Sequence, residues 1–525
     1  MPELTELWPI LRSPTFTSTA GYPYLQEPAF VRLRDWVPLL FSDGATLLGD
    51  LDCALEQDAS VQQAVRVVRQ VVNTAAVTAP PDLWLLRQVL DTLRQRGTLQ
   101  ALATACVKPD RELAIDLSFL LSRGYLTRQG DSFRLAEHSH AQGLLELPEL
   151  PALGDLVPVW RAHLRGEGPA PEHGPLLPQA REPGLWFATA HEIQLGFRLV
   201  PLVLAVHAEG LQEQPLTPQA EALLAQCGLS GGPLRQRVLR RGPGPFGIIQ
   251  AYHPYMAQLS QILDGGRGSV HVERSANVAA SQVANRKSFE RMSAALDRFC
   301  QDTGHRYGVH IEHALGRGEA TRQRWEAGPE GLVFVGADLE DASLDAARAQ
   351  QAQGHLPADM RFVQADIGNP QQLLAPLADL DLEGAVMVVG NGFHEVRGAG
   401  DSLLIAAMKA YQEAGLILLF TEESALAVDD LLHTAFNTYH AGFKYVHERS
   451  GQGLRPATPV PPSALAMPLS ASWTECAEQA GYRRVERYCV RSRTIYPYTP
   501  AGGHNPAISV NHFFVPERIA RELAL

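Results

Sequence analysis

The sequence predicts an α/β protein with a mainly parallel sheet in its C-terminal part and a mostly helical region before it. The first observation is a series of short apolar segments that alternate with helical segments after residue 302, at 310–315, 331–337, 360–365, 385–389 and 416–420. Segments this apolar are typical of strands buried on both faces of a parallel sheet. The second observation is the length of 525 residues, which exceeds what one hydrophobic core supports and predicts several domains.

The charge and the cysteine pattern exclude several classes of protein. The chain carries 57 acidic and 45 basic side chains, and its net charge of −12 opposes general binding to nucleic acid or to an anionic membrane. Its six cysteines form no C-x-x-C pair, so neither a zinc ribbon nor a disulfide framework is expected. The start of the chain lacks the pattern of a secretion signal, and the apolar run 199–208 has about half the length of a membrane helix. We therefore expect a cytoplasmic protein.

Residues 1–146 form the first predicted region. Aromatic and proline residues in the first sixty positions suggest an irregular lead-in, and helical spacing begins at Asp82 and ends at Gly97. Two further helices are expected at about 99–105 and 110–122, followed by a β-hairpin. Three helices and a hairpin over about 82–135 predict a winged-helix module.

The function of this winged-helix module follows from its charge. The third helix, which would enter a DNA groove, carries Asp110, Glu112 and Asp116, whereas phosphate contacts need a basic face. The apolar residues Trp84, Leu85 and Leu93 instead predict a packing module through which a homodimer forms. We expect no nucleic-acid partner and no membrane partner.

Three further regions are expected after the winged-helix module. Proline and glycine are dense in 147–184, which predicts a linker. A mostly helical segment over 185–301 is expected to form a lid or substrate segment. The region 302–525 then contains the alternating strands and helices of the predicted sheet.

Polar residues follow the predicted strands in an informative order. Gly316 and Gly318 come after the first strand, where glycine lets the backbone approach a ligand closely. Asp338 ends the second strand, 22 positions after Gly316, and its carboxylate can accept hydrogen bonds from both hydroxyls of a ribose. Asp366 ends the third strand and can accept from an adenine amino group.

With this order of residues, the region 305–425 resembles the class I S-adenosylmethionine-dependent methyltransferases, which have a Rossmann-like fold. Glu312 and Gly316-x-Gly318 match the family's first motif, although Ala314 stands in place of its first glycine. The resemblance implies S-adenosyl-L-methionine as the cofactor, bound by Glu312, Gly316, Gly318, Asp338, Leu339, Asp366, Ile367 and Asn391. A dinucleotide-binding dehydrogenase is the competing interpretation, but its G-x-G-x-x-G motif is absent from 314–318. A third interpretation is a nucleotide-binding domain that has lost catalysis.

The resemblance places the methyl acceptor after the fourth strand, where His394 and Glu395 are the catalytic candidates. Together with the winged helix and the helical segment, it implies a small-molecule or carrier-bound natural-product intermediate as acceptor. His394 could act as a general base, as in an O-methyltransferase without metal. Alternatively, His394, His440 and Glu422 could hold Fe, Mn or Zn and stabilise the enolate of a C-methylation acceptor. The non-enzymatic alternative is a cofactor-sensing winged-helix regulator.

Overall fold

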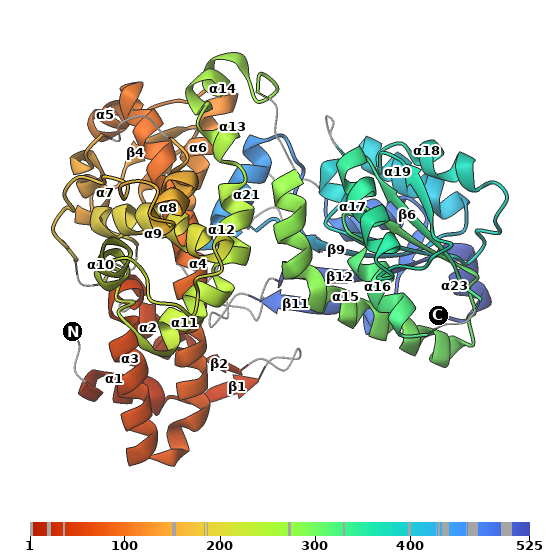
Figure 1. Cartoon of the computed structure of the whole chain (residues 1–525), viewed down its shortest axis with the longest axis horizontal. Helices are drawn as coiled ribbons and strands as arrows, with labels where there is room; N and C mark the ends of the chain where they lie inside the picture. Colours follow the sequence, from red (N-terminus) through yellow and green to blue (C-terminus); the bar gives the residue numbers. More distant parts are fainter. Residues whose placement is uncertain are drawn as a thin grey trace. The chain divides into compact units, whose positions relative to one another are not determined.

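The structure is a computed structural model in which the chain forms two compact units (Figure 1). It describes residues 4–17, 23–34, 37–149, 154–182, 184–185, 187–270, 275–328, 331–396, 401–426, 428, 431–432, 440–457, 459, 471–494 and 507–525, in places by the backbone alone. The first unit comprises Met1–Glu273, Val428–Ser450 and Ile495–Pro506, and the second comprises Arg274–Ala427, Gly451–Thr494 and Ala507–Leu525.

The first unit is mainly helical. Its elements are α1 (Leu4–Leu11), β1 (Thr15–Thr17), β2 (Pro23–Leu25), α2 (Glu27–Arg34), α3 (Val37–Gln57), α4 (Gln62–Gln95), α5 (Thr98–Thr104), α6 (Arg111–Ser122), β3 (Leu126–Gln129), β4 (Ser132–Leu135), α7 (Ser139–Gln142), α8 (Leu156–Leu164), α9 (Ala190–Ala208), α10 (Pro218–Gln226), α11 (Gly232–Arg241), α12 (Pro243–Gln250), α13 (His253–Met256), α14 (Leu259–Gly265) and α21 (His440–Arg449). The helices expected over 185–301 are therefore present, and helix α8 lies within the expected linker.

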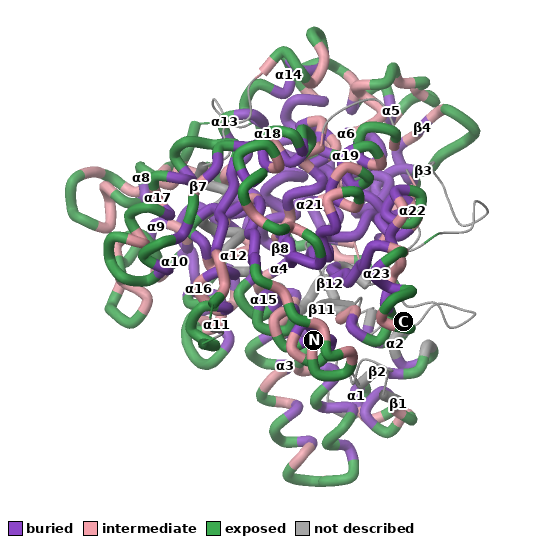
Figure 2. The backbone as a smooth tube through the Cα atoms, turned by 90° about the vertical axis from the view of Figure 1, so that its right-hand side faces the viewer, coloured by how far each residue is buried: buried purple, intermediate pink, exposed green. Residues whose placement is uncertain are grey.

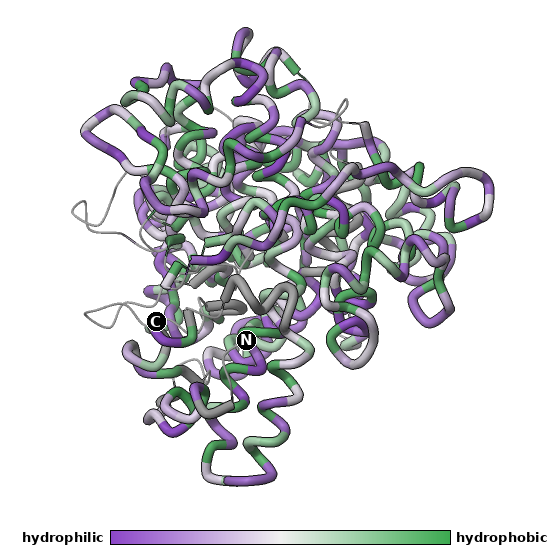
Figure 3. Tube along the Cα trace, turned by 90° about the vertical axis from the view of Figure 1, so that its left-hand side faces the viewer, coloured by the Kyte–Doolittle hydropathy of each residue, from purple (hydrophilic) through white to green (hydrophobic). Residues whose placement is uncertain are grey.

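Helices α4 and α9 form the centre of this unit. Both are buried along most of their length, and Gly196 of α9 lies so close to Leu83 that a larger side chain would overlap it. A Thr189 capping box with Glu192 fixes the start of α9. Buried residues lie inside the fold and exposed residues lie on its outer loops (Figure 2), and many of the outer loops are hydrophilic (Figure 3).

Two expectations for the N-terminal region were wrong. The first sixty residues contain helices α1, α2 and most of α3, and α4 begins at Gln62 instead of Asp82. Pro80 and Pro81 resemble a helix start, because proline lacks the backbone N–H that an interior position donates. In the structure both prolines are buried within α4. Burial of the helix on its neighbours therefore outweighs the lost hydrogen bonds.

The three helices and the hairpin expected over 82–135 are present as α4, α5, α6, β3 and β4. Trp84, Leu85 and Leu93 are buried within the unit. The chain's own core therefore accounts for their apolar character. The homodimer stays a prediction, and these three residues no longer argue for it.

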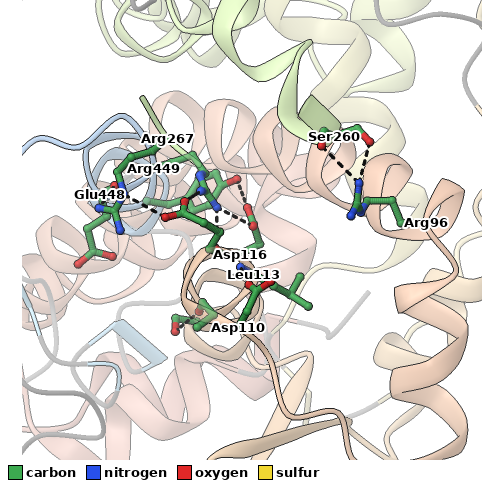
Figure 4. A network of polar contacts seen from close by, with 12 residues as sticks. Arg96, Asp110, Leu113, Asp116, Ser260, Arg267, Glu448 and Arg449 are labelled. Carbon is green, nitrogen blue, oxygen red and sulfur yellow. Dashed lines mark hydrogen bonds and ion pairs between the residues drawn. The ribbon is translucent and has the colours of Figure 1, made fainter. Parts of the chain in front are cut away.

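The acidic residues of α6 pair with α21, which comes from far along the chain. Asp116 is fully buried and accepts hydrogen bonds from the Tyr445 hydroxyl at 2.6 Å and from Arg449 Nη1 at 2.9 Å. Arg449 also pairs with the Glu112 carboxylate, and Arg267 lies 3.5 Å from the same carboxylate (Figure 4). These ion pairs fasten α21 to α6, so the acidity of α6 has a structural explanation.

A second buried ion pair holds the other end of α21. Asp82 accepts a hydrogen bond from Gly442 N at 3.1 Å and lies 3.5 Å from Arg123, whose Nη2 donates to Leu431 O at 2.8 Å. Burial raises the pKa of Asp82 to about 7. Gly442 has no room for a side chain beside Asp82, which explains why a glycine stands there.

The second unit contains the expected sheet. Its elements are α15 (Ser275–Thr303), β5 (Val309–His313), α16 (Glu319–Glu326), β6 (Val333–Asp338), α17 (Asp341–Ala352), β7 (Arg361–Gln364), α18 (Pro370–Leu374), β8 (Val386–Gly390), η4 (Phe393–Glu395), α19 (Ser402–Glu413), β9 (Ile417–Glu423), α22 (Trp473–Gln479), β10 (Tyr482–Arg484), β11 (Val490–Thr494), β12 (Ala507–Pro516) and α23 (Glu517–Glu522). The strand order is β10-β12-β9-β8-β5-β6-β7, and β11 pairs with β12.

The order of the parallel strands reverses between β5 and β8. The chain proceeds from β5 to β6 and β7 on one side and then returns to place β8 and β9 on the other, whereas β12 runs antiparallel to β9. Residues of α18, α19 and α22 cover one face of the sheet, and residues of α15, α16 and α17 cover the other. The predicted mainly parallel α/β fold is confirmed. In such sheets ligands bind beyond the carboxyl ends of the strands, at the point of reversal.

Among the described residues, no helix is both long and apolar enough to cross a membrane.

The α6–α21 ion pairs give a test of packing. Arg449→Met leaves Asp116 buried without its cationic partner, so we expect the free energy of unfolding of the first unit to fall by about 3–5 kcal/mol. The double variant Asp116→Leu with Arg449→Met removes both charges and should recover at least about 1 kcal/mol of that loss. Urea unfolding followed by circular dichroism measures both. A double variant no more stable than Arg449→Met would contradict the assignment.

Candidate active site

The candidate site lies at the carboxyl ends of β5, β6, β8 and β9, on both sides of the reversal in strand order. A polar residue that the sequence analysis had selected lies within one position of the end of each strand: Glu312, Asp338, Asn391 and Glu422. Glu312, Asp338 and Glu422 are each no more than 8% exposed. A buried carboxylate needs hydrogen-bond donors, and the donors that these three find determine the shape of the site.

The turn after β5 has left-handed backbone conformations at three positions. The φ angle is 58° at Ala314, 52° at Gly316 and 79° at Gly318. Glycine adopts this conformation without steric cost, whereas alanine is strained there. The departure of Ala314 from the family's glycine therefore leaves the left-handed turn in place and adds strain to it.

Glu312 connects strand β5 to the start of helix α16, which follows this turn. Its carboxylate accepts hydrogen bonds from the backbone N–H groups of Ala320 at 3.2 Å and Thr321 at 2.6 Å, at the start of helix α16. Helix α16 has no side-chain cap at Gly318, so the carboxylate satisfies N–H groups that the helix leaves unpaired. Burial raises the pKa of Glu312 to about 7. A contact between Glu312 and a cofactor stays a prediction.

Asp338 connects the turn after β5 to the end of β6. Its Oδ2 accepts from Gly316 N at 2.9 Å and its Oδ1 from Glu340 N at 3.1 Å, and burial raises its pKa. The Ser343 side chain also forms a hydrogen bond with this carboxylate, so its four lone-pair positions leave capacity for a further donor, such as a hydroxyl of a ribose. Leu339, the next residue, is 49% exposed although it is apolar.

The end of β7 joins the same edge. Ala365 N donates to Asp338 O at 2.9 Å, and Asp366 follows with its Oδ1 accepting from Gly368 N at 2.8 Å. Ile367 is buried, and its carbonyl accepts from the Tyr411 hydroxyl at 3.0 Å. The three loops that the sequence analysis assigned to the cofactor are thus connected through hydrogen bonds to Asp338.

The turn after β8 packs directly against the turn after β5. A Cβ atom placed on Gly392 would lie 2.9 Å from Ala314 Cβ and 3.4 Å from Ile367 Cδ1. Asn391, just before it, has a φ of 54°, and its side-chain oxygen is buried without a hydrogen-bond partner in the described part of the chain. Buried polar groups are usually paired, so this oxygen marks a position where a ligand donor would be accommodated.

His394, in the short helix η4 that follows β8, and Glu422 of the neighbouring strand β9 form a buried pair. His394 Nδ1 lies 2.7 Å from Glu422 Oε2, and the other carboxylate oxygen accepts from Phe393 N at 2.7 Å and His394 N at 3.3 Å. A carboxylate can only accept, so Nδ1 carries the hydrogen, and when the ring is neutral Nε2 carries the lone pair. Glu422 thus sets the tautomer and the orientation of His394.

Glu395 stands on the other side of the imidazole. Its Oε1 lies 3.7 Å from His394 Nε2, which is too long for a hydrogen bond but close enough for electrostatic attraction to a protonated ring. The Gln452 side-chain amide donates to the same Oε1, and Gly453 N donates to His394 O at 3.0 Å. The imidazole is therefore flanked by two carboxylates.

The predicted metal ligands are brought together only in part. His394 and Glu422 are in contact, but at 2.7 Å they share a hydrogen bond, and Glu422 also accepts two backbone N–H groups. His440 begins α21 in the first unit, and its side chain lies outside the described residues. No group of three or more histidine, cysteine, aspartate or glutamate residues suited to a metal is found within the described ranges.

Two features of the site were missed by the sequence analysis. Glu422 was expected as a metal ligand, and the pattern gave no sign that it would bond His394, which is 28 positions away. Gln452 was not selected at all, because it stands between Gly451 and Gly453 in a segment without strand or motif pattern. The adjacency of β8 and β9 was the one signal that could have paired His394 with Glu422.

No family model matches the chain, and no curated protein sequence matches it. The similar solved structures include the CurJ carbon methyltransferase, with 12% identity over 82% of this chain and 99% of that one and a TM-score of 0.34. The citrinin polyketide synthase CMeT domain has 10% identity over 85% and 93% of the two chains, with a TM-score of 0.35. An S-adenosylmethionine-dependent methyltransferase from Clostridium acetobutylicum has 9% identity over 43% and 91%, with a TM-score of 0.27. Because these TM-scores are below 0.5, the fold assignment rests on the sheet topology.

The strained turn after β5 can be tested by a substitution that relieves it. Ala314→Gly should raise the free energy of unfolding of the second unit by about 1 kcal/mol, because glycine adopts the left-handed conformation without the Cβ clash. The matched control is Ala349→Gly on the exposed side of helix α17, which should lower it by about 0.5–1 kcal/mol. Thermal and urea unfolding measure both variants. The same sign for both would show that Ala314 is unstrained.

Proposed function

We propose that the chain is an S-adenosylmethionine-dependent methyltransferase in which the His394–Glu422 pair acts as the general base. The observation that carries this proposal is the position of the pair. Gly392, which precedes the pair's His394 by two positions, packs against Ala314 in the turn that Asp338 holds, at the reversal of strand order. A ligand bound at that turn lies at the edge of the sheet where His394 also stands.

The residues present fit the cofactor. The Asp338 carboxylate has acceptor capacity for a ribose hydroxyl, and exposed Leu339 offers an apolar surface for a base. The buried side-chain oxygen of Asn391 accepts no hydrogen bond from the described residues. The left-handed turn at Gly316 and Gly318 keeps side chains out of the path of a ligand. When bound, S-adenosylmethionine supplies an electrophilic methyl group on a sulfonium. Glu312 supports this site by holding the start of α16, and its direct contact with the cofactor remains part of the proposal.

The roles of the dyad follow from its hydrogen bonds. Nε2 of His394 would remove a proton from the acceptor and leave it the electron pair that attacks the methyl group. Bound S-adenosylmethionine would supply that methyl group and keep the carbon–sulfur electron pair on sulfur, and the proton would pass from His394 to solvent. When Nε2 takes up the proton, Glu422 stabilises the resulting imidazolium through its hydrogen bond with Nδ1. A charge-assisted hydrogen bond strengthens when both partners are charged.

We further propose a small-molecule or carrier-bound natural-product intermediate as the acceptor. A base of this kind suits an acidic carbon next to a carbonyl as well as a hydroxyl group. The proposal of base catalysis is favoured over a metal because both oxygens of Glu422 are already engaged by hydrogen-bond donors. Metal analysis of the purified protein separates the two.

The alternative of a cofactor-sensing regulator is disfavoured by α6. Residues Asp116 to Ser122 of this helix are buried, and Arg449 and Tyr445 of α21 pair with its acidic side. A recognition helix must present an open basic face to a DNA groove. We therefore propose a structural role for the winged-helix elements within the first unit.

The dyad can be tested by paired substitutions. His394→Gln and Glu422→Gln should each lower turnover by about 100-fold or more, while calorimetry shows nearly unchanged S-adenosylmethionine affinity. The assay follows release of S-adenosylhomocysteine with two probe sets, β-keto thioesters of N-acetylcysteamine and simple phenols. Turnover by His394→Gln within a few-fold of the native protein would overturn the proposal.

A separate test concerns the cofactor site. Asp338→Asn should weaken S-adenosylmethionine binding by about 1–3 kcal/mol, because an amide supplies one acceptor oxygen instead of two. Asp379→Asn is the control, since Asp379 pairs with Arg361 at the protein surface. Calorimetry that finds equal affinity in a folded Asp338→Asn protein would remove Asp338 from the cofactor site.

A further inference from the structure

We infer that Gln452 is a positioning residue that holds the Glu395 carboxylate, with its charge intact, beside Nε2 of His394. The inference rests on the proposed function, because it concerns the imidazole that acts as base there. Gln452 was not selected by the sequence pattern, and it is not a member of the His394–Glu422 pair.

The geometry places Gln452 where it can control Glu395. Its amide donates to Glu395 Oε1, the oxygen that lies 3.7 Å from His394 Nε2. The next residue, Gly453, donates its backbone N–H to His394 O at 3.0 Å. Two consecutive residues thus contact the two consecutive residues of the site, so a shift of either segment moves both contacts together.

The backbone around Gln452 favours a fixed position. Gly451 has a φ of 82°, which turns the chain directly before Gln452, and the Gln452 side chain is 4% exposed. Further along, Ala425 N donates to Arg455 O at 2.7 Å, and Arg455 pairs with Asp401. The segment is therefore attached to β9 on one side and to the turn before α19 on another.

The chemistry of an amide donor is suited to this role. A lysine or arginine at position 452 would neutralise Glu395, whereas an amide hydrogen bond orients the carboxylate and keeps its negative charge. That charge favours the protonated form of the imidazole and disfavours the neutral form, so it strengthens the base. At 3.7 Å, Glu395 forms no hydrogen bond with Nε2. The carboxylate therefore does not compete with the methyl acceptor for contact with this nitrogen.

Among the described residues, two elements place a carboxylate beside the imidazole. Glu422 of β9 bonds Nδ1, and Glu395 of η4 stands near Nε2. Arg455, the cation of the neighbouring segment, is committed to Asp401. Removing the Glu395 charge, or letting it move away, should therefore shift the protonation of His394 toward lower pH.

The experiment measures His394 directly by NMR in protein labelled with ¹³C at histidine Cε1, so it needs no acceptor. The signal of His394 is identified by its loss in His394→Gln. Glu395→Gln should lower the titration midpoint of this signal by about one pH unit. Gln452→Met, which keeps the length of the side chain and removes the donor, should shift it in the same direction by a smaller amount.

The matched control is Gln351→Met in helix α17 of the same unit. Gln351 also donates to backbone carbonyls, at 2.9 Å to Pro357 O and 3.1 Å to Ala358 O, but it has no contact with Glu395 among the hydrogen bonds of the described residues. It should leave the midpoint unchanged. If Gln452→Met does not fold, Gln452→Asn, which shortens the amide by one methylene, takes its place with the same expected direction.

The outcomes separate this inference from the proposed function. A midpoint in Gln452→Met equal to that of the native protein and of Gln351→Met would overturn the positioning role. Activity retained in His394→Gln would instead overturn the dyad, whatever the midpoints show. A shift in both Glu395→Gln and Gln452→Met, with the control unchanged, supports the inference.

Discussion

Buried carboxylates at strand ends are the constraint on which the second unit depends. Glu312, Asp338 and Glu422 each lie in the last two positions of a strand. Each accepts backbone N–H groups of the segments beyond the strand ends: Ala320 and Thr321, Gly316 and Glu340, and Phe393 and His394. A charge in this position is costly to desolvate, and the fixed N–H dipoles offset that cost. The same bonds determine where the turns stand, so the site is shaped by the groups that keep it folded.

The strain in the site lies where these turns meet. Ala314 and Asn391 both have left-handed conformations, and their turns touch at Gly392, which has no room for a side chain. Non-glycine residues are held in such conformations only when the surrounding structure determines them. Here the carboxylate bonds on both sides of the reversal do so.

Much of this fold could be predicted from the sequence, because strand segments and strand-end acids are local signals. Residues such as Asp338 and Asp366 follow apolar runs, and the structure has strands at each of the predicted positions. What could not be predicted depends on distant contacts. Arg449 pairs with Asp116 across 333 positions, and no local pattern announces that α21 belongs to the first unit. Likewise Pro80 and Pro81 indicate a helix start locally, and only burial of the whole helix overrides them.

The site combines residues that local sequence patterns predict with residues that only distant contacts bring together. This division follows from the chemistry of the residues. Groups that bind a cofactor stand on strand ends and turns with a regular order, so their spacing carries information. The role proposed for His394 depends on its protonation. The groups near each ring nitrogen determine that protonation, here Glu422 at Nδ1 and Glu395 near Nε2. Those neighbours reach the imidazole through strand adjacency and through a glycine-flanked segment at Gln452, whose position no periodicity encodes. The basicity of the site is therefore a property of the tertiary structure, whereas its cofactor motif is a property of the chain.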